Sequence, residues 1–245
     1  MKLVDAHCHL HELSDNELLS YCNTDDLKII AVADDLISSL KTLKISKRCS
    51  NVVPSVGVHP WVISKVDEKE IDAILEIAAS NNVRFLGEVG IDKRFVPQTY
   101  DLQVDIFKKL IEYASSNGLG VNVHAAGAWD DALKILFKYD VKVAIIHWYT
   151  GPIELLNDLR SVGYFITVNP AVKVQLKSRD VVHKAPLDII LTESDSPYIY
   201  RGMRLTPEKV LDAAREIALI KGIELEDVVN AILTNYLKVL NSIGL

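Results

Sequence analysis

The sequence has few cysteines, and its three, Cys8, Cys22 and Cys49, form no Cys-x-x-Cys pair. Small secreted proteins that depend on disulfides usually carry an even and denser set of cysteines. An odd count with wide spacing is more typical of a chain in a reducing compartment. We therefore expect a cytoplasmic protein without a disulfide framework.

Long apolar segments are also missing. No stretch approaches the roughly 18 uncharged apolar residues of a membrane-spanning helix. The N-terminal segment MKLVDAHCHL is interrupted by Asp5 and His7, which does not fit the apolar centre of a signal peptide. The sequence therefore predicts no membrane partner, and it leaves the oligomeric state open.

Positive charge is in deficit, because 27 Lys and Arg face 33 Asp and Glu, for a net charge of −6. This excludes a uniformly basic nucleic-acid-binding protein, although a local basic cluster around a cleft stays possible. Low-complexity tracts and linkers are absent as well. The 245 residues fit one large domain, 1–245, of the length that an α/β barrel needs.

Short β-rich runs alternate with helical stretches along the chain. Most are dominated by Val and Ile and are nearly apolar throughout, as in strands buried on both faces of a parallel sheet. The runs are Leu3–Cys8, Lys28–Ala33, Val52–Val58, Val83–Glu88, Gly120–His124, Lys142–His147, Tyr164–Val168 and Asp188–Thr192. Eight such units predict an α/β fold, a (β/α)8 TIM barrel. An open doubly wound sheet is the alternative, but no Gly-x-Gly-x-x-Gly motif follows the first run.

Helical spacing is clearest in two of the connecting stretches. In 100–116 apolar residues repeat every four positions, as on one face of an amphipathic helix. In 207–221 Thr206 is placed to cap the helix and Pro207 occupies its first position. The tail after Gly222 is also helical and should pack on the outside of the barrel.

Ligand-type side chains gather where the predicted strands end, which is where barrel enzymes place their chemistry. These residues are His7, His9, His59, Glu88, Asp92, His124, His147 and Asp195. His7 and His9 point to the same side because side chains alternate along a strand. Cys8 between them points the other way, out of the barrel toward the surrounding helices, where we expect it to be part of the core. One such pair could be two core histidines with satisfied hydrogen bonds, but its recurrence at other strand ends favours metal ligands. His11 lies past the strand and is expected on the surface or in a loop.

The motifs, taken together, resemble the TatD-type metal-dependent deoxyribonucleases of the amidohydrolase (urease-related) superfamily. The stretches that carry the resemblance are DAHCHL, GVHPW, FLGEVGID, QVDIFKKLIEYA, VNVHAAGAWDDAL, IIHWYTG and TESDSPYI. The resemblance implies two divalent cations, one held by His7, His9 and Asp195 and the other by His124 and His147. Glu88 would bridge them. Zn, Mn and Mg remain possible, and mixed histidine and carboxylate ligands favour Zn or Mn.

The implied chemistry is hydrolysis by a water that the metal ions activate. Asp195 and Glu88 are the expected catalytic residues, with Asp195 accepting a proton from that water. The predicted substrate-binding residues are His59, Lys93, Arg94, Arg201 and Arg204. Together with Lys173, the cations would form a basic rim for a phosphate, although Lys and Arg are common on loops. Rings past the strand ends, including Trp61, Trp148, Tyr149 and Tyr198, could stack a base or simply pack.

The leading prediction is an enzyme, a TatD-like exodeoxyribonuclease that removes nucleotides in the 3′-to-5′ direction from a DNA end. The alternatives are an ester hydrolase on the same metals, such as a D-aminoacyl-tRNA deacylase, and a barrel that only binds. Two stretches depart from the family pattern. The family's Arg after the fifth-strand histidine is absent from His124-Ala125-Ala126, and the segment after Tyr198 reads RGMRLTP in part. Both departures put the contacts to the substrate in doubt.

Overall fold

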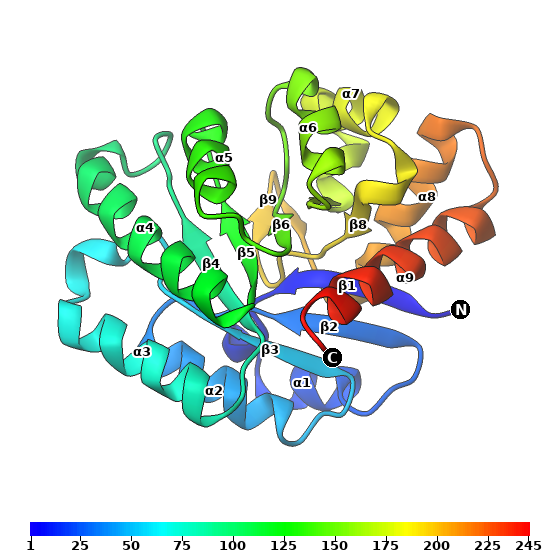
Figure 1. Cartoon of the computed structure of the whole chain (residues 1–245). Helices are drawn as coiled ribbons and strands as arrows, with labels where there is room; N and C mark the ends of the chain where they lie inside the picture. Colours follow the sequence, from blue (N-terminus) through cyan, green and yellow to red (C-terminus); the bar gives the residue numbers. More distant parts are fainter.

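Eight parallel strands form one sheet whose spatial order, β1 to β8, is the order of the sequence (Figure 1). The computed structural model describes residues 1–245. The strands are β1 (Leu3–Cys8), β2 (Leu27–Ala31), β3 (Val52–Val56), β4 (Phe85–Gly90), β5 (Gly120–His124), β6 (Ala144–Ile146), β7 (Phe165–Val168) and β8 (Ile190–Thr192). Each strand pairs in parallel with the next, as βαβ connections require.

The chain after β8 returns to β1 and nearly closes the barrel. Asp195 N donates a hydrogen bond to His7 O at 3.0 Å, and His9 N donates to Ser196 O at 2.9 Å. The side chain of Thr192 also donates to Val4 O at 2.6 Å. The predicted (β/α)8 TIM barrel is therefore confirmed, and the open sheet is wrong.

Helices surround the sheet on all sides in Figure 1. They are α1 (Asp15–Tyr21), α2 (Leu36–Ser46), α3 (Glu68–Ser80), α4 (Tyr100–Asn117), α5 (Trp129–Lys138), α6 (Leu156–Ser161), α7 (Leu176–Lys184), α8 (Val210–Lys221) and α9 (Leu225–Ser242). Single 3₁₀ turns occupy Leu10–Glu12, Ile63–Lys65, Pro97–Thr99, Ile153–Leu155, Pro170–Lys173, Leu187–Ile189 and Pro207–Lys209. A two-stranded hairpin, β9 (Ile199–Tyr200) and β10 (Met203–Arg204), follows β8. No helix combines the length and apolar character needed to cross a membrane.

The helix predicted from Pro207 begins differently. Residues 207–209 form a 3₁₀ turn, and α8 starts at Val210. Thr206 does not cap the backbone, because its hydroxyl donates instead to the Glu208 carboxylate at 2.7 Å. The helix that ends the chain, α9, packs against β1, β8 and α8, as expected of a tail on the outside of the barrel.

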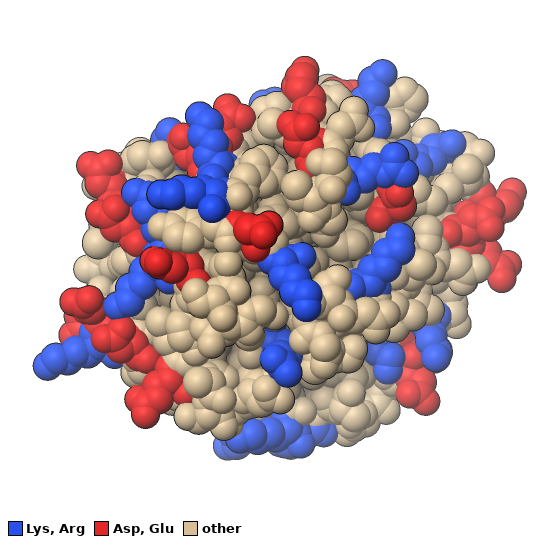
Figure 2. All heavy atoms as spheres, in the orientation of Figure 1, with Lys and Arg blue, Asp and Glu red and all other residues tan.

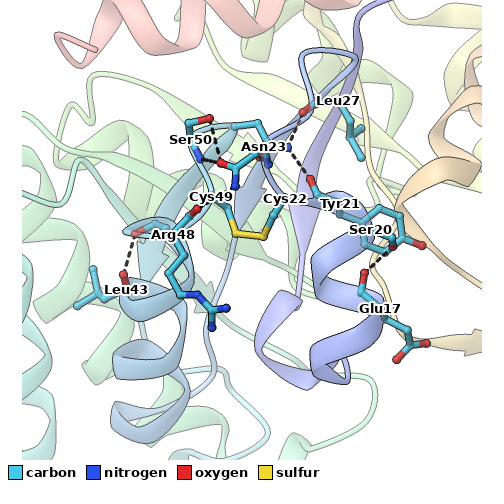
Figure 3. The surroundings of a disulfide bond; sticks show 12 residues. Glu17, Ser20, Tyr21, Cys22, Asn23, Leu27, Leu43, Arg48, Cys49 and Ser50 are labelled. Carbon is cyan, nitrogen blue, oxygen red and sulfur yellow. Dashed lines mark hydrogen bonds between the residues drawn. A yellow bond between two sulfur atoms is a disulfide. The ribbon is translucent and has the colours of Figure 1, made fainter.

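The side chains of two cysteines form a disulfide, which contradicts the expectation from the sequence. Cys22 follows α1 and Cys49 follows α2, and their Cα atoms lie 4.7 Å apart (Figure 3). Hydrogen bonds tie the same two connections together: Asn51 Oδ1 accepts from Asn23 N at 2.8 Å, and Asn23 Oδ1 accepts from Ser50 N at 3.0 Å. The expectation of a reducing compartment was based on unpaired, widely spaced cysteines, and the Cys22–Cys49 disulfide removes that basis. Cys8 is free and buried in the core, as predicted.

Charge is mixed on the face of the molecule shown in Figure 2, where Lys and Arg are interspersed with Asp and Glu and separated by uncharged residues, in the middle as well as around the edge. No continuous basic surface is visible there, in keeping with the net charge of −6. On this face, any attraction for an anion therefore has to come from a few local cations.

Candidate metal centre

The carboxylate of Glu88, at the end of β4, is the centre of a cluster of histidines. Its Oε1 lies 2.8 Å from His124 Nδ1 and 3.3 Å from His147 Nε2. Its Oε2 lies 3.2 Å from Nε2 of both His7 and His9. One buried carboxylate thus has the His7 and His9 nitrogens at one oxygen and the His124 and His147 nitrogens at the other, where His59 also makes contact.

Asp195 completes the group around His7 and His9. Its Oδ1 lies 3.6 Å from His7 Nε2 and 3.5 Å from His9 Nε2. The residue adopts a left-handed backbone with φ of 54°, a conformation that Asp and Asn tolerate better than most residues. The six side chains predicted as ligands therefore lie together at the C-terminal ends of the strands.

Gly90 explains how β4 and β5 come close enough for Glu88 to meet His124. A Cβ at position 90 would lie only 1.9 Å from His124 O. The backbone of β4 can approach β5 this closely only where no side chain intervenes. The Gly at the end of the GEVG stretch is therefore part of what assembles the cluster.

The spacing of the ring nitrogens fits divalent cations. His7 Nε2 and His9 Nε2 lie 3.2 Å apart, and so do His124 Nδ1 and His147 Nε2. Two nitrogens that bind one tetrahedral ion at about 2.1 Å lie roughly 3.4 Å from each other. The unprotonated nitrogens of two neutral imidazoles and a carboxylate oxygen are all hydrogen-bond acceptors. Where they face one another, a proton or a cation has to lie between them. The donor set therefore fits two metal ions, one on each side of Glu88.

Each of the four histidines also has an acceptor oxygen beside its outer ring nitrogen. The pairs are His7 Nδ1 with Asn122 Oδ1 at 2.7 Å, His124 Nε2 with Asp92 Oδ2 at 3.0 Å, His9 Nδ1 with Asp34 Oδ1 at 3.2 Å and His147 Nδ1 with Glu193 Oε2 at 3.4 Å. The last two pairs lack the alignment of a hydrogen bond. An acceptor in this position holds the ring proton on the outer nitrogen and leaves the inner lone pair for a metal ion.

Asp92 was among the ligand-type side chains named at the strand ends, but none of these four partners was predicted to hold a histidine. Asn122 could have been found, because it lies two residues before His124 on the same strand and points to the same side. Glu193 lies two residues before Asp195 in a buried segment. Asp34 and Asp92 come from loops, whose path the sequence does not reveal.

The charges of the cluster shift its pKa values in opposite directions. Burial would lower the pKa of His7, but the Glu88 carboxylate raises it to about 9. The pKa of His124 is lowered by burial and raised more strongly by hydrogen bonds to Asp92 and Glu88, again to about 9. Burial would raise the pKa of Glu88, yet the surrounding imidazoles hold it well below its usual range. Without metal, the cluster therefore binds protons where cations would bind.

His59 contacts the same carboxylate. Its Nε2 lies 3.2 Å from Glu88 Oε1, and its Nδ1 accepts from Trp61 N at 3.1 Å. Predicted as a substrate-binding residue, His59 thus lies beside the cluster, where it forms a group of possible ligands with Glu88 and His124.

A cavity of about 580 Å³ opens above the cluster. Aromatic rings line two of its walls. Trp61 and Phe95 contact each other with ring centroids 5.7 Å apart, and Trp148 contacts Tyr198 at 5.8 Å and Tyr200 at 5.4 Å. Tyr149 is not among these rings, because it is buried and its hydroxyl donates to Pro152 O at 2.6 Å.

The cations predicted for the rim do not share one location. Arg94 lines the cavity and forms no ion pair. Lys93 instead pairs with Asp131 beside a smaller hollow, and Arg204 pairs with Glu17.

Two further predicted cations lie outside the cavity lining. Arg201 is exposed, with its guanidinium 5.5 Å from the centre of the Tyr200 ring, and Lys173 is exposed as well. Lys177 of α7, which was not predicted, lines the cavity and forms no ion pair. Arg94 and Lys177 are therefore the two cations best placed to meet an anionic ligand.

His11 lies in the 3₁₀ turn after β1, in the connection where a surface or loop residue was expected, but its side chain is not on the surface. Only 6% of its side chain is exposed. Its Nε2 lies 3.1 Å from Asp34 Oδ2, and its Nδ1 lies 3.2 Å from Val32 O. His11 thus touches Asp34, the partner of His9, rather than Glu88.

Comparison with known proteins places the chain among metal-dependent hydrolases. A family model described as TatD related DNase matches residues 4–241. The metal-dependent hydrolase YcfH of Escherichia coli is 31% identical over 96% of this chain and 94% of its own length. A metal-dependent hydrolase of Methanocaldococcus jannaschii is 29% identical, covering 97% of this chain and 96% of its own.

A human relative carries a more specific name. A deoxyribonuclease of Homo sapiens is 28% identical over 96% of this chain and 93% of its own length. Among solved structures, YJJV, a TatD homolog from Escherichia coli, superposes with a TM-score of 0.86 at 21% identity, covering 98% of both chains. The superposition shows the same fold.

Proposed function

Because the chain belongs to the TatD related DNase family and is a metal-dependent hydrolase, we propose that it cleaves phosphodiester bonds at the 3′ end of DNA. The observation that carries the proposal is Glu88, which has the His7 and His9 nitrogens at one oxygen and the His124 and His147 nitrogens, with His59 beside them, at the other. One carboxylate shared by two ligand pairs fits the two-cation arrangement that phosphodiester hydrolysis uses. The name of the human relative adds support for DNA as the substrate.

Six residues would hold the two cations. His7, His9 and Asp195 would bind one, His124 and His147 the other, and Glu88 both. When bound, the cations would lower the pKa of a water molecule and offset the charge that develops on the phosphate oxygens. The mixture of imidazole and carboxylate ligands favours Zn or Mn over Mg.

Asp195 is the proposed general base. Its carboxylate lines the cavity and its Oδ1 stays within 3.6 Å of the His7 and His9 nitrogens. Burial would raise its pKa, but the neighbouring histidines lower it below its usual range, so the group is an anion at neutral pH. An ionised carboxylate in this position can accept a proton from water held over the cluster.

The cavity suits the end of a nucleic-acid strand. Arg94 and Lys177 offer unpaired cations to phosphates, and the two aromatic walls offer ring faces to unpaired bases. Lys93 and Arg204 are no longer part of the proposed binding surface, because their charges are neutralised by Asp131 and Glu17. Arg94 supplies a cation although the family's arginine after His124 is absent.

A substrate screen tests the proposal. Metal-loaded protein should shorten a 5′-labelled single-stranded oligonucleotide one nucleotide at a time, with Asp195→Asn as the inactive control. RNA and D-aminoacyl-tRNA should be run beside it. Rapid release of the amino acid with the oligonucleotide intact after hours would replace the nuclease proposal with the ester hydrolase.

A further inference from the structure

Asp92 is buried at the junction between the metal centre and the cavity wall, and all of its oxygen lone pairs are engaged. Its Oδ1 accepts from the backbone N–H groups of Arg94 at 2.8 Å and Phe95 at 2.7 Å. Its Oδ2 accepts from Trp61 Nε1 at 2.6 Å and lies 3.0 Å from His124 Nε2. The backbone N–H of Asp92 itself donates to Gln103 Oε1 at 2.6 Å, so the residue cannot move easily.

Asp92 Oδ2 holds a proton on the Nε2 nitrogen of His124. A carboxylate only accepts hydrogen bonds, so the short contact requires a proton on Nε2. The opposite ring nitrogen, Nδ1, lies 2.8 Å from Glu88 Oε1, which is also a carboxylate oxygen, so in the metal-free chain Nδ1 carries a proton as well. A cation bound beside Glu88 would take the place of the proton on Nδ1. The proton that Asp92 keeps on Nε2 would then leave Nδ1 with the lone pair that a metal ligand needs.

We propose that Asp92 is a positioning residue that fixes His124 in the Nε2–H tautomer and so makes Nδ1 available to the cation on that side of Glu88. The inference rests on the proposed two-cation centre and adds to it a residue that touches neither cation. Because the same carboxylate holds Trp61, Arg94 and Phe95, one buried group orients a metal ligand and part of the cavity wall.

Asp92→Asn tests the proposal with a small change of shape. The amide oxygen of Asn can still accept from the two backbone N–H groups at the old Oδ1 position. The amide nitrogen would then face both His124 Nε2 and Trp61 Nε1 as a donor. This drives the ring proton of His124 to Nδ1 and breaks the hydrogen bond from Trp61, which the Trp61→Phe control also removes. Nδ1 would donate to Glu88 instead of binding a cation.

The readout is metal binding by the metal-free full-length chain, titrated with Mn²⁺ and with Zn²⁺ by calorimetry. Asp92→Asn should weaken one of two binding steps at least about tenfold, the lower end for such partners of metal-bound histidine, and leave the other within about threefold. Trp61→Phe is the matched control, since it removes a different hydrogen bond to the same oxygen. It should leave both steps within about threefold.

A double-mutant cycle separates positioning from general support of the fold. If Asp92 acts through His124, then Asp92→Asn should have no further effect on metal binding in a His124→Ala background. The inference would be overturned if Asp92→Asn weakened metal binding equally in the wild-type and His124→Ala backgrounds. It would also be overturned if Asp92→Asn weakened both binding steps of the wild-type chain equally. Two normal binding steps in Asp92→Asn would overturn it while leaving the proposed function intact, whereas a wild-type chain that binds no metal ions would overturn both.

A measurement on the wild-type chain covers the case in which Asp92→Asn fails to fold. In the zinc-loaded protein, NMR of the ring nitrogens should show the His124 proton on Nε2, with the signal assigned through its absence in His124→Ala. A proton on Nδ1 would overturn the inference.

Discussion

At the scale of single residues, Asp195 carries the proposed proton transfer. Replacing it by Asn keeps the shape of the side chain and tolerates the left-handed backbone at φ of 54°. Asp195→Asn should therefore fold normally and lower kcat at least about a hundredfold, the lower end for loss of a general base. Single-turnover kinetics at saturating metal would measure this. A rate within threefold of the wild type would show that another group is the base.

Arg94 and Lys177 are the residues predicted to bind the phosphate backbone. Arg94→Ala and Lys177→Ala should each raise KM for single-stranded DNA by about tenfold, because each removes one unpaired cation from the cavity. Each should also reduce the dependence of log Kd on log salt by about 0.7, the value for one phosphate contact. Arg204→Ala is the matched control, since its charge is already paired with Glu17. Equal effects of all three substitutions would contradict a specific role for the cavity cations.

Some site residues could be predicted from the sequence and others could not, because the roles of the others depend on side-chain partners that only the fold brings together. The six ligand candidates could be found because strand geometry brings the ends of parallel strands together. The rim cations could not be sorted in the same way, because pairing of Lys93 with Asp131 depends on how two separate loops pack. Asp92 was visible as the last residue of FLGEVGID, but its contact with His124 appears only in three dimensions.

At the scale of secondary-structure elements, the apolar runs identified all eight strands, while their limits shifted by up to two residues. β6, for example, begins at Ala144 rather than Lys142. A buried strand is marked by its apolar residues, but where pairing starts depends on its neighbours. The disulfide also depends on neighbours in space that the sequence does not reveal. Cys22 and Cys49 meet only because the connections after α1 and α2 lie side by side.

The disulfide should stabilise the first third of the barrel measurably. It closes a loop with a sequence separation of 27, for which the chain-entropy relation gives about 3–4 kcal/mol. Cys22→Ser should lower the free energy of unfolding by this amount in reversible denaturation. Cys49→Ser and the double variant should match it, because all three lose the same bond. A double variant much less stable than either single one would show that the thiols contribute separately.

At the scale of the whole molecule, the metal-free protein should lose stability as the pH rises. The pKa values of His7 and His124 are raised to about 9 in the folded chain, from about 6.5 when unfolded. Their contribution is fully present below pH 6.5 and disappears as the pH rises through 9. Metal ions displace the same protons, so their stabilising effect should increase over this window.

Unfolding of chelator-treated and metal-loaded protein at pH 6.5 and pH 9 would test this. The gap between the two forms should widen at the higher pH. A metal-free protein as stable at pH 9 as at pH 6.5 would argue against protonated histidines in the cluster.

The most direct test of the account is the metal content of the protein. Elemental analysis of dialysed wild-type chain should find two divalent ions, and Glu88→Ala should lose both, because its carboxylate faces both histidine pairs. His124→Ala should lose metal from one side only. Two ions retained in Glu88→Ala would contradict the bridged centre on which the proposed hydrolysis depends.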